Sequence, residues 1–275
     1  MINVENLSIH FEDRGQNDEV VKNVSFSIED GEILGIVGES GSGKTMTVLT
    51  IAGLIKDNAI IDSGKIYLDG KDILALSKKE MRSIQGKEIS MIFQEPMTAL
   101  NPTMKIGQQV EEVLKLHTDL NKSEREIKVL QSLKDVELSN PEELIKKYPY
   151  ELSGGMRQRV MIASAIICRP KLLIADEPTT ALDVTTQESI LKLLKKLNKK
   201  YGMSILFISH NLRVVGKLCK RVLVMKSGVI IEEGITEEIF ENPKEEYTKE
   251  LISAIPTRVK DNPFYDILRK EEGNG

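Results

Sequence analysis

Two separate stretches of this chain combine glycines with residues that can hold a phosphate group. Residues 38–45 read GESGSGKT and fit the phosphate-loop pattern G-x-x-x-x-G-K-[ST]. Residues 152–159 read LSGGMRQR, in which Ser153 precedes two glycines. One nucleotide needs only one such loop, so we predict that the second stretch serves a nucleotide held elsewhere, most simply by another subunit.

The first stretch has the flanks that a phosphate-binding loop requires, with an apolar run before it and a helical pattern after it. Glycines let backbone N–H groups turn towards phosphates, and a helix N-terminus adds about half a positive charge. We expect Lys44 to reach the β- and γ-phosphates and Thr45 to bind Mg²⁺. The nucleotide-binding residues predicted here are Gly38, Glu39, Ser40, Gly41, Ser42, Gly43, Lys44 and Thr45.

Two acids follow the apolar run 172–175. A buried strand places such residues at the carboxyl edge of a sheet, near a phosphate loop. We expect Asp176 to hold Mg²⁺ and Glu177 to polarise the attacking water as a general base. The alternative for the pair alone is a helix cap with solvated acids, and the phosphate loop in the same chain favours the catalytic role.

Polar residues also follow two further apolar runs. His210 comes after residues 205–209, so we expect it at the same sheet edge, in contact with the γ-phosphate region. Gln94 comes after residues 91–93, and its amide can bind Mg²⁺ or water and can swing with the loop that follows. A structural role is the alternative for a lone histidine or glutamine.

In the second stretch, Ser153 can cap a helix that begins at Gly154 and Gly155. Its hydroxyl and the exposed N–H groups would bind a γ-phosphate as any helix N-terminus does. The alternative is an ordinary helix cap, with Arg157 and Arg159 on a solvated face.

The elements that position these residues indicate an α/β fold. Continuous apolar runs at 33–37, 172–175, 205–209 and 222–225 are typical of parallel strands buried on both faces. Between the runs at 172–175 and 205–209, apolar residues at helical spacing predict a helix over 185–201 that ends at Gly202.

Three regions flank this core. The alternating pattern of residues 2–11 and 24–28 predicts an antiparallel β edge, with a polar loop over 12–19. Residues from about 96 to 155 lack strand-like runs and are interpreted as an inserted helical subdomain. Residues 1–235 would form one nucleotide-binding domain, and 236–275 a charged C-terminal extension with an irregular tail from Lys260.

Composition excludes several functions. The net charge is -4, which gives no support for a nucleic-acid partner. No run of 18 apolar residues and no signal peptide is visible, so we expect a cytosolic protein. The two cysteines, Cys168 and Cys219, lack metal-ligand spacing and are interpreted as free thiols.

These motifs in this order resemble the nucleotide-binding subunit of an ATP-binding cassette (ABC) transporter. The resemblance covers residues 2 to about 256 and implies a P-loop NTPase (RecA-like) core that binds ATP. It further implies that Phe11 stacks on the adenine, the alternative being a core edge residue, and that Asp183 belongs to the nucleotide site. The matching segments are GESGSGKT at 38–45, Gln94, LSGGMRQR at 152–159, LLIADE at 172–177, ALD at 181–183 and His210.

More specifically, the chain resembles the oligopeptide, dipeptide and nickel importer subgroup, on residues 38–43, 93–102, 168–184 and 247–256 and on Met156. Peptide is the expected substrate, and a nickel complex or metallophore stays open. Many members carry a cysteine-rich segment that binds an iron–sulfur cluster, but no cysteine follows Cys219, so we predict no cluster.

The resemblance also implies partners: a paralogous ATPase in a head-to-tail heterodimer, two transmembrane permease subunits, and indirectly an extracytoplasmic solute-binding protein. The chain would lie on the cytoplasmic face of the membrane, with residues 94–104 touching a permease. A soluble ABC ATPase acting on ribosomes or DNA is a distant alternative. A P-loop kinase or GTPase is disfavoured, because residues 198–201 read NKKY and lack the N-K-x-D guanine reader.

Overall fold

The chain forms two sheets with helices around them. The computed structural model describes residues 1–13, 16–55, 58–94, 99–180 and 182–255. The strands are β1 (Ile2–Asp13), β2 (Gln16–Ile28), β3 (Ile33–Val37), β4 (Ala59–Leu68), β5 (Lys71–Asp72), β6 (Ile89–Ile92), β7 (Leu172–Asp176), β8 (Ser204–Ser209), β9 (Arg221–Lys226) and β10 (Val229–Ile235). The helices are α1 (Lys44–Ile51), α2 (Lys78–Ile84), α4 (Ile106–His117), α5 (Lys122–Asp135), α6 (Pro141–Leu144), the 3₁₀ helix η1 (Pro149–Glu151), α7 (Gly154–Ile166), α8 (Val184–Tyr201), α9 (Leu212–Leu218), α10 (Thr236–Glu241) and α11 (Glu246–Ser253).

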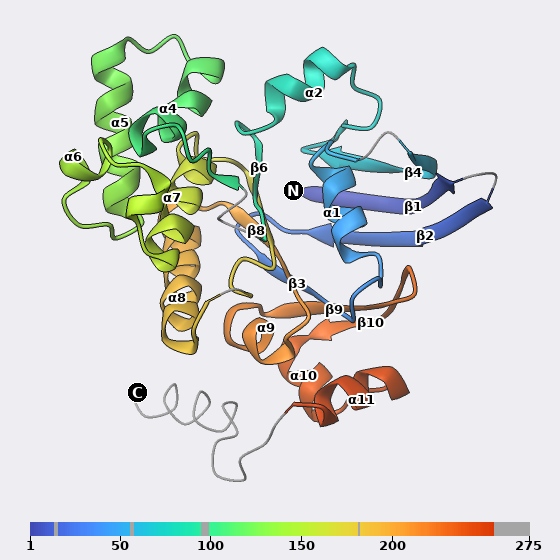
Figure 1. Cartoon of the computed structure of the whole chain (residues 1–275). Coiled ribbons are helices and arrows are strands. Elements are labelled where there is room, and N and C mark those ends of the chain that lie inside the picture. The colour runs from blue at the N-terminus through green and yellow to red at the C-terminus, as the bar shows by residue number, and fades with distance from the viewer. Residues whose placement is uncertain (14–15, 56–57, 95–98, 181, 256–275) are drawn as a thin grey trace.

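A six-stranded sheet with the order β10-β9-β3-β8-β7-β6 lies at the centre (Figure 1). Strands β9, β3, β8, β7 and β6 run parallel, and β10 pairs antiparallel with β9. The four continuous apolar runs coincide with β3, β7, β8 and β9, so the prediction of an α/β fold with parallel strands is confirmed. The carboxyl ends of these strands meet at one edge, where ligands bind in open α/β sheets.

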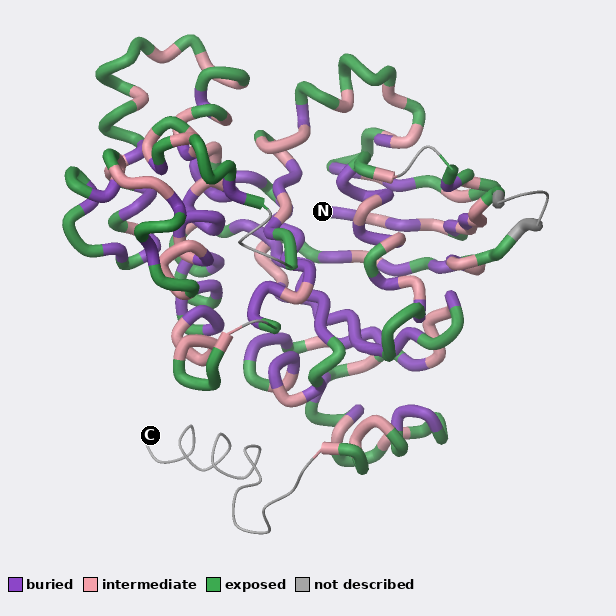
Figure 2. Tube along the Cα trace, viewed as in Figure 1, coloured by how far each residue is buried: buried purple, intermediate pink, exposed green. Residues whose placement is uncertain are grey.

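Alternate side chains of the central strands enter two different apolar cores. In β8, Phe207 belongs to the core that includes α7, α8 and α9, whereas Leu206 and Ile208 belong to the core that includes α1 and the antiparallel sheet. Figure 2 shows the buried positions concentrated on these strands, and exposed positions on the outer turns of α2 and α5. Burial on both faces explains why the strands read as continuous apolar runs.

The predicted antiparallel edge is a four-stranded sheet with the order β2-β1-β4-β5. The prediction of a loop over residues 12–19 is wrong, because β1 continues to Asp13 and β2 begins at Gln16. Phe11 pairs with Asp18 across this hairpin. Strand pairing uses backbone N–H and C=O groups, so polar residues extend the ladder without an apolar side chain.

Helices α4 to α7 lie between β6 and β7 in the sequence and group together on the left in Figure 1. Arg125 Nε of α5 lies 2.7 Å from Glu111 Oε1 of α4, and the Ser132 hydroxyl of α5 donates to the Ala163 carbonyl of α7 at 2.8 Å. Helix α7 continues to Ile166, so an insertion that ended at residue 155 would stop in its first turn. The division into 1–235, with 96–155 inserted, and 236–275 stays a prediction.

The C-terminal part of the described chain contacts β10, where the Glu232 carboxylate accepts from the Lys244 N–H at 2.8 Å. Helices α10 and α11 follow β10 (Figure 1). The irregular tail expected from Lys260 lies outside the described residues. Among the helices of the described ranges, none combines the length and apolar character that a membrane crossing requires.

Truncation of Phe207 tests this core. The side chain is 0% exposed, so Phe207→Ala should lower the free energy of unfolding by about 3–5 kcal/mol through lost burial and a residual cavity. Denaturant unfolding followed by circular dichroism measures the change. Leu116, which is 74% exposed, is the matched control, and Leu116→Ala should stay within about 0.5 kcal/mol of the unmodified protein. Equal losses in the two variants would contradict the assigned core.

Candidate functional site

The phosphate loop joins β3 to α1, as the sequence predicts, and its glycines lie against neighbouring backbone. A Cβ on Gly38 would come within 2.1 Å of the Met225 carbonyl oxygen, at the end of β9. A Cβ on Gly43, whose φ is +99°, would come within 2.5 Å of the Val20 carbonyl oxygen. The φ of Gly38 is also positive, at +154°, so both positions require glycine for space and for backbone conformation.

Lys44 is buried within its own loop at 5% exposure. Its ammonium group donates to the carbonyl oxygens of Gly38 at 2.8 Å and Glu39 at 2.7 Å, and to the Ser42 hydroxyl at 3.2 Å. Burial lowers the pKa of Lys44, while the charge of Glu177 and then that of the adjacent acid, Asp176, oppose this shift. The loop therefore holds a buried cation among its own backbone and hydroxyl oxygens.

Asp176 ends β7 beside this loop. Burial, together with the charge of Glu177, raises the pKa of Asp176 to about 6, and the Thr45 hydroxyl and Lys44 act in the opposite direction. Its buried Oδ1 has no hydrogen-bond partner among the described residues. A carboxylate oxygen and a hydroxyl are oxygen ligands of the kind that Mg²⁺ takes, and a nearby cation would favour the charged carboxylate. The residues fit a Mg²⁺ ion held by Asp176 and Thr45, where it would stabilise the negative charge of transferring phosphate.

Glu177 is the meeting point of three strand ends. Its Oε2 accepts hydrogen bonds from Gln94 Nε2 at 3.2 Å and from the Thr180 hydroxyl at 2.9 Å, and it lies 3.0 Å from His210 Nδ1. An ionised carboxylate can only accept, so the last contact requires the proton on Nδ1. No described hydrogen bond uses the other oxygen, Oε1, which can therefore accept from a water molecule.

The backbone of Glu177 is held in an uncommon conformation. Its φ of 46° lies in the left-handed region, which costs free energy in a residue with a Cβ. The Glu177 N–H donates to the Ile208 carbonyl of β8 at 3.0 Å. Such outliers persist where the surrounding structure over-determines them, and they cluster at functional sites.

The second glycine stretch forms a different site. Ser153 is the N-cap of α7, and its hydroxyl accepts from the Met156 N–H at 3.3 Å, so the predicted helix cap is confirmed. A Cβ on Gly155 would come within 2.9 Å of Thr186, whose N–H donates to Asp183 at 2.9 Å. Asp183 thus caps α8 next to the start of α7, and two helix N-termini lie together.

The structure therefore brings together Lys44, Thr45, Asp176, Glu177, Gln94 and His210. No hydrogen bond or ion pair of the described residues joins 153–155 to 38–45. Phe11 lies in β1, half-buried, and packs against the core of the antiparallel sheet. Its contact with an adenine, like the individual roles of the other site residues, stays a prediction.

Sequence reasoning missed two contacts. The Thr180 hydroxyl donates to Glu177, and the only sequence signal for this contact is that Thr180 follows Glu177 by three residues, in the turn after β7. Tyr247 of α11 reaches the phosphate loop, where its hydroxyl accepts a hydrogen bond from the Glu39 N–H at 3.0 Å. No sequence signal could have placed this tyrosine there.

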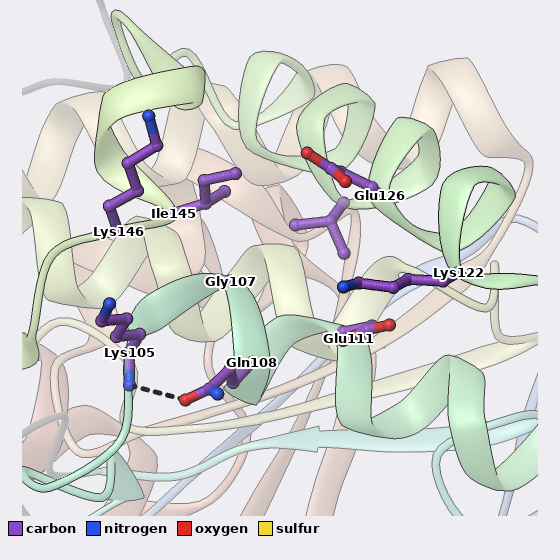
Figure 3. Close-up of a pocket in the computed structure, with 9 residues that line it drawn as sticks. Lys105, Gly107, Gln108, Glu111, Lys122, Glu126, Ile145 and Lys146 are labelled. Atoms are coloured by element: carbon purple, nitrogen blue, oxygen red, sulfur yellow. Dashed lines mark hydrogen bonds between the residues drawn. The ribbon is translucent and has the colours of Figure 1, made fainter.

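A cavity of about 190 Å³ lies elsewhere, in the helical region (Figure 3). Charged side chains of both signs surround it, including Lys105, Glu111, Lys122, Glu126 and Lys146. None of the predicted nucleotide-site residues lines it. The phosphate loop, Gln94, Glu177 and His210 instead follow the carboxyl ends of β3, β6, β7 and β8.

A glycine loop between a buried strand and a helix, with a buried lysine in it and an acid pair on a nearby strand, defines a P-loop nucleoside triphosphatase. Over residues 21–180 the chain matches the family model described as ABC transporter. The chain belongs to the ABC transporter family and is an ATP-binding ATPase of that family. The fold class and the family resemblance are thereby confirmed.

Similar proteins agree with this assignment. The chain is 48% identical over 258 residues to the oligopeptide transport ATP-binding protein OppD of Bacillus subtilis, covering 94% of this chain and 72% of that protein. It is 46% identical over 256 residues to the dipeptide transport ATP-binding protein DppD of Haemophilus influenzae, covering 93% and 78%. A dimeric structure of the ATP-binding cassette MJ0796 bound to ADP and Pi is similar at a TM-score of 0.77 and 31% identity, covering 86% of this chain and 99% of that one.

Two glycine-to-alanine variants test the close packing of the phosphate loop. Gly38→Ala should lower the free energy of unfolding by about 1–3 kcal/mol, because the new Cβ must displace backbone. Gly154→Ala is the matched control, since open space surrounds its Cβ and its φ is not positive. It should change stability by less than about 0.5 kcal/mol. Denaturant melts of both variants give the comparison, and a Gly38→Ala melt equal to that of the control would refute the contact with Met225.

Proposed function

We propose that this chain is the ATP-hydrolysing subunit that energises peptide import through an ABC transporter. The observation that carries the proposal is the set of contacts around Glu177, in which one carboxylate oxygen is held by three side chains and the other stays available. The relatives named as oligopeptide and dipeptide transport ATP-binding proteins support peptide as the cargo.

The catalytic cycle assigns one task to each residue of the cluster. Lys44 leaves its own carbonyl acceptors and binds the β- and γ-phosphates. Thr45 and Asp176 would hold Mg²⁺, which would stabilise negative charge on the transferring phosphate, and Gln94 would either bind the same ion or orient a water molecule. Glu177 accepts a proton from the attacking water through Oε1, and His210 contacts the γ-phosphate while its Nδ1 proton holds Oε2 in place.

The second site acts on a nucleotide held by another ATPase. The exposed N–H groups at the start of α7 can bind the γ-phosphate of a partner's ATP, next to Ser153 and Asp183. We propose a head-to-tail pair with a paralogous ATPase, in which each chain completes the other's site. The similar MJ0796 cassette forms a dimer, which supports this arrangement.

The pair would lie on the cytoplasmic face of the membrane, against two transmembrane permease subunits, with a solute-binding protein delivering the peptide from outside. The loop after Gln94 would touch a permease, although residues 95–98 of that loop lie outside the described residues. Gln94 bonds directly to Glu177, so a shift of this loop would move a catalytic contact.

Glu177→Gln separates ATP binding from hydrolysis. The amide keeps the size of the side chain but cannot accept a proton from water, so turnover should fall by about 10²–10⁴-fold while ATP affinity stays within twofold. Phosphate release and equilibrium ATP binding measure the two quantities. Glu237→Gln, an exposed glutamate in the first turn of α10, is the control and should keep full turnover. Undiminished turnover in Glu177→Gln would remove this residue from its role.

The same variant tests the cargo when it is placed in the complete transporter. Vesicles that contain the permeases and the paired ATPases should accumulate a labelled dipeptide or oligopeptide, and Glu177→Gln should abolish this uptake. Uptake of a nickel complex, with no peptide uptake, would instead assign the chain to a metal importer.

Dilution tests the shared site. Specific ATPase activity should fall as the protein is diluted below the dissociation constant of the pair, because each site needs residues from two chains. In the assembled pair, Ser153→Ala combined with Gly154→Ala should cut turnover at the partner's nucleotide by about 100-fold, the effect expected for loss of a phosphate-stabilising donor. Full activity of a lone, highly diluted chain with both substitutions would contradict the shared site.

A further inference from the structure

The C-terminal helix α11 makes a direct contact with the phosphate loop. The hydroxyl of Tyr247 accepts a hydrogen bond from the Glu39 N–H at 3.0 Å, across 208 residues of sequence. Tyr247 is only 5% exposed, and its hydrogen bond to Glu39 is partly buried. It joins the part of the chain after β10 to the loop expected to hold ATP.

This hydrogen bond acts on the same peptide group that holds Lys44. The carbonyl of Gly38 and the N–H of Glu39 belong to one planar peptide unit, and in a trans unit they point in opposite directions. Lys44 Nζ donates to this carbonyl at 2.8 Å, while Tyr247 accepts from the N–H on the other side. The tyrosine therefore sets the orientation of a carbonyl that positions the Lys44 ammonium group.

Tyr247 is itself held firmly by the core. The ammonium of Lys226, the last residue of β9, lies 4.4 Å from the centre of its ring, within the range of a cation–π interaction. The buried carboxylate of Glu232 in β10 accepts from the Lys244 N–H at 2.8 Å and from the Glu245 N–H at 3.2 Å, just before α11 begins. The start of α11 is thus tied to the central sheet.

We propose that Tyr247 is a positioning residue of the ATP site, which couples the docking of α11 to the affinity of the phosphate loop for ATP. The proposal rests on the proposed role of Lys44 as a phosphate ligand. When Lys44 turns to the phosphates, the Gly38 carbonyl loses its donor, and the hydrogen bond to Tyr247 keeps this peptide unit from rotating into the nucleotide site. Coupling of this kind is reciprocal, so bound ATP should also stabilise the docked position of α11.

Tyr247→Phe tests the proposal, because it removes the hydroxyl and leaves the ring against Lys226. ATP should bind about fivefold more weakly, the effect of one lost hydrogen bond, while kcat at saturating ATP stays within twofold. Hydrogen exchange should become faster at the Glu39 amide. Bound ATP should slow exchange in α11 of the unmodified protein and do so less in the variant.

Tyr67→Phe is the matched control. Tyr67 of β4 pairs with Asn3 in β1, whereas Phe11, the predicted adenine contact, lies at the other end of that strand. It should leave ATP affinity unchanged. Unaltered ATP affinity in Tyr247→Phe, or a fall in kcat at constant affinity, would overturn the positioning role. Lys44→Ala separates the two proposals: normal ATP affinity in that variant refutes the phosphate role of Lys44, whereas weakened affinity there beside normal affinity in Tyr247→Phe refutes only the role of Tyr247.

Discussion

The burial of the Lys44 ammonium group within its own loop is the interaction on which the rest of the site depends. Its hydrogen bonds go to two carbonyls and a hydroxyl, and none of the described ion pairs includes it. A carboxylate partner would hold the cation strongly and compete with a phosphate, because charge-assisted hydrogen bonds are about twice as strong as neutral ones. Neutral acceptors instead solvate the cation while leaving it free to transfer to a phosphate.

This arrangement requires the phosphate loop to pack closely against neighbouring backbone. Glycines at 38 and 43 let the loop lie against the backbone of β9 and β2, and any side chain there would push it away. The nearby acids stabilise the cation from a distance, while burial raises the pKa of Asp176 to about 6. Burial therefore disfavours the charged form of both Lys44 and Asp176 in this site.

The geometry of parallel strands supplies the remaining groups. Strands β6, β7 and β8 are neighbours, so Gln94, Glu177 and His210, which follow them, meet at one carboxylate. The starts of α7 and α8 lie together in the same way, because Gly155 leaves space for Thr186. No hydrogen bond or ion pair of the described residues joins residues 153–155 to the phosphate loop, so the two groups are separate within this chain.

The sequence by itself determined the central strands, the phosphate loop, the acid pair and the helix cap at Ser153. Continuous apolar runs identify strands buried on both faces, and glycine spacing reports a local backbone requirement. The sequence did not predict that β1 continues through the polar residues Glu12 and Asp13, because backbone pairing does not depend on side-chain polarity. Only the tertiary structure decided that Thr180 and His210 share an oxygen of Glu177. It also decided that Tyr247 accepts from the Glu39 N–H, in the peptide unit whose carbonyl accepts from Lys44. The contacts of His210 and Tyr247 join segments 33 and 208 residues apart, and the sequence does not indicate which partner a hydroxyl or a ring nitrogen will contact.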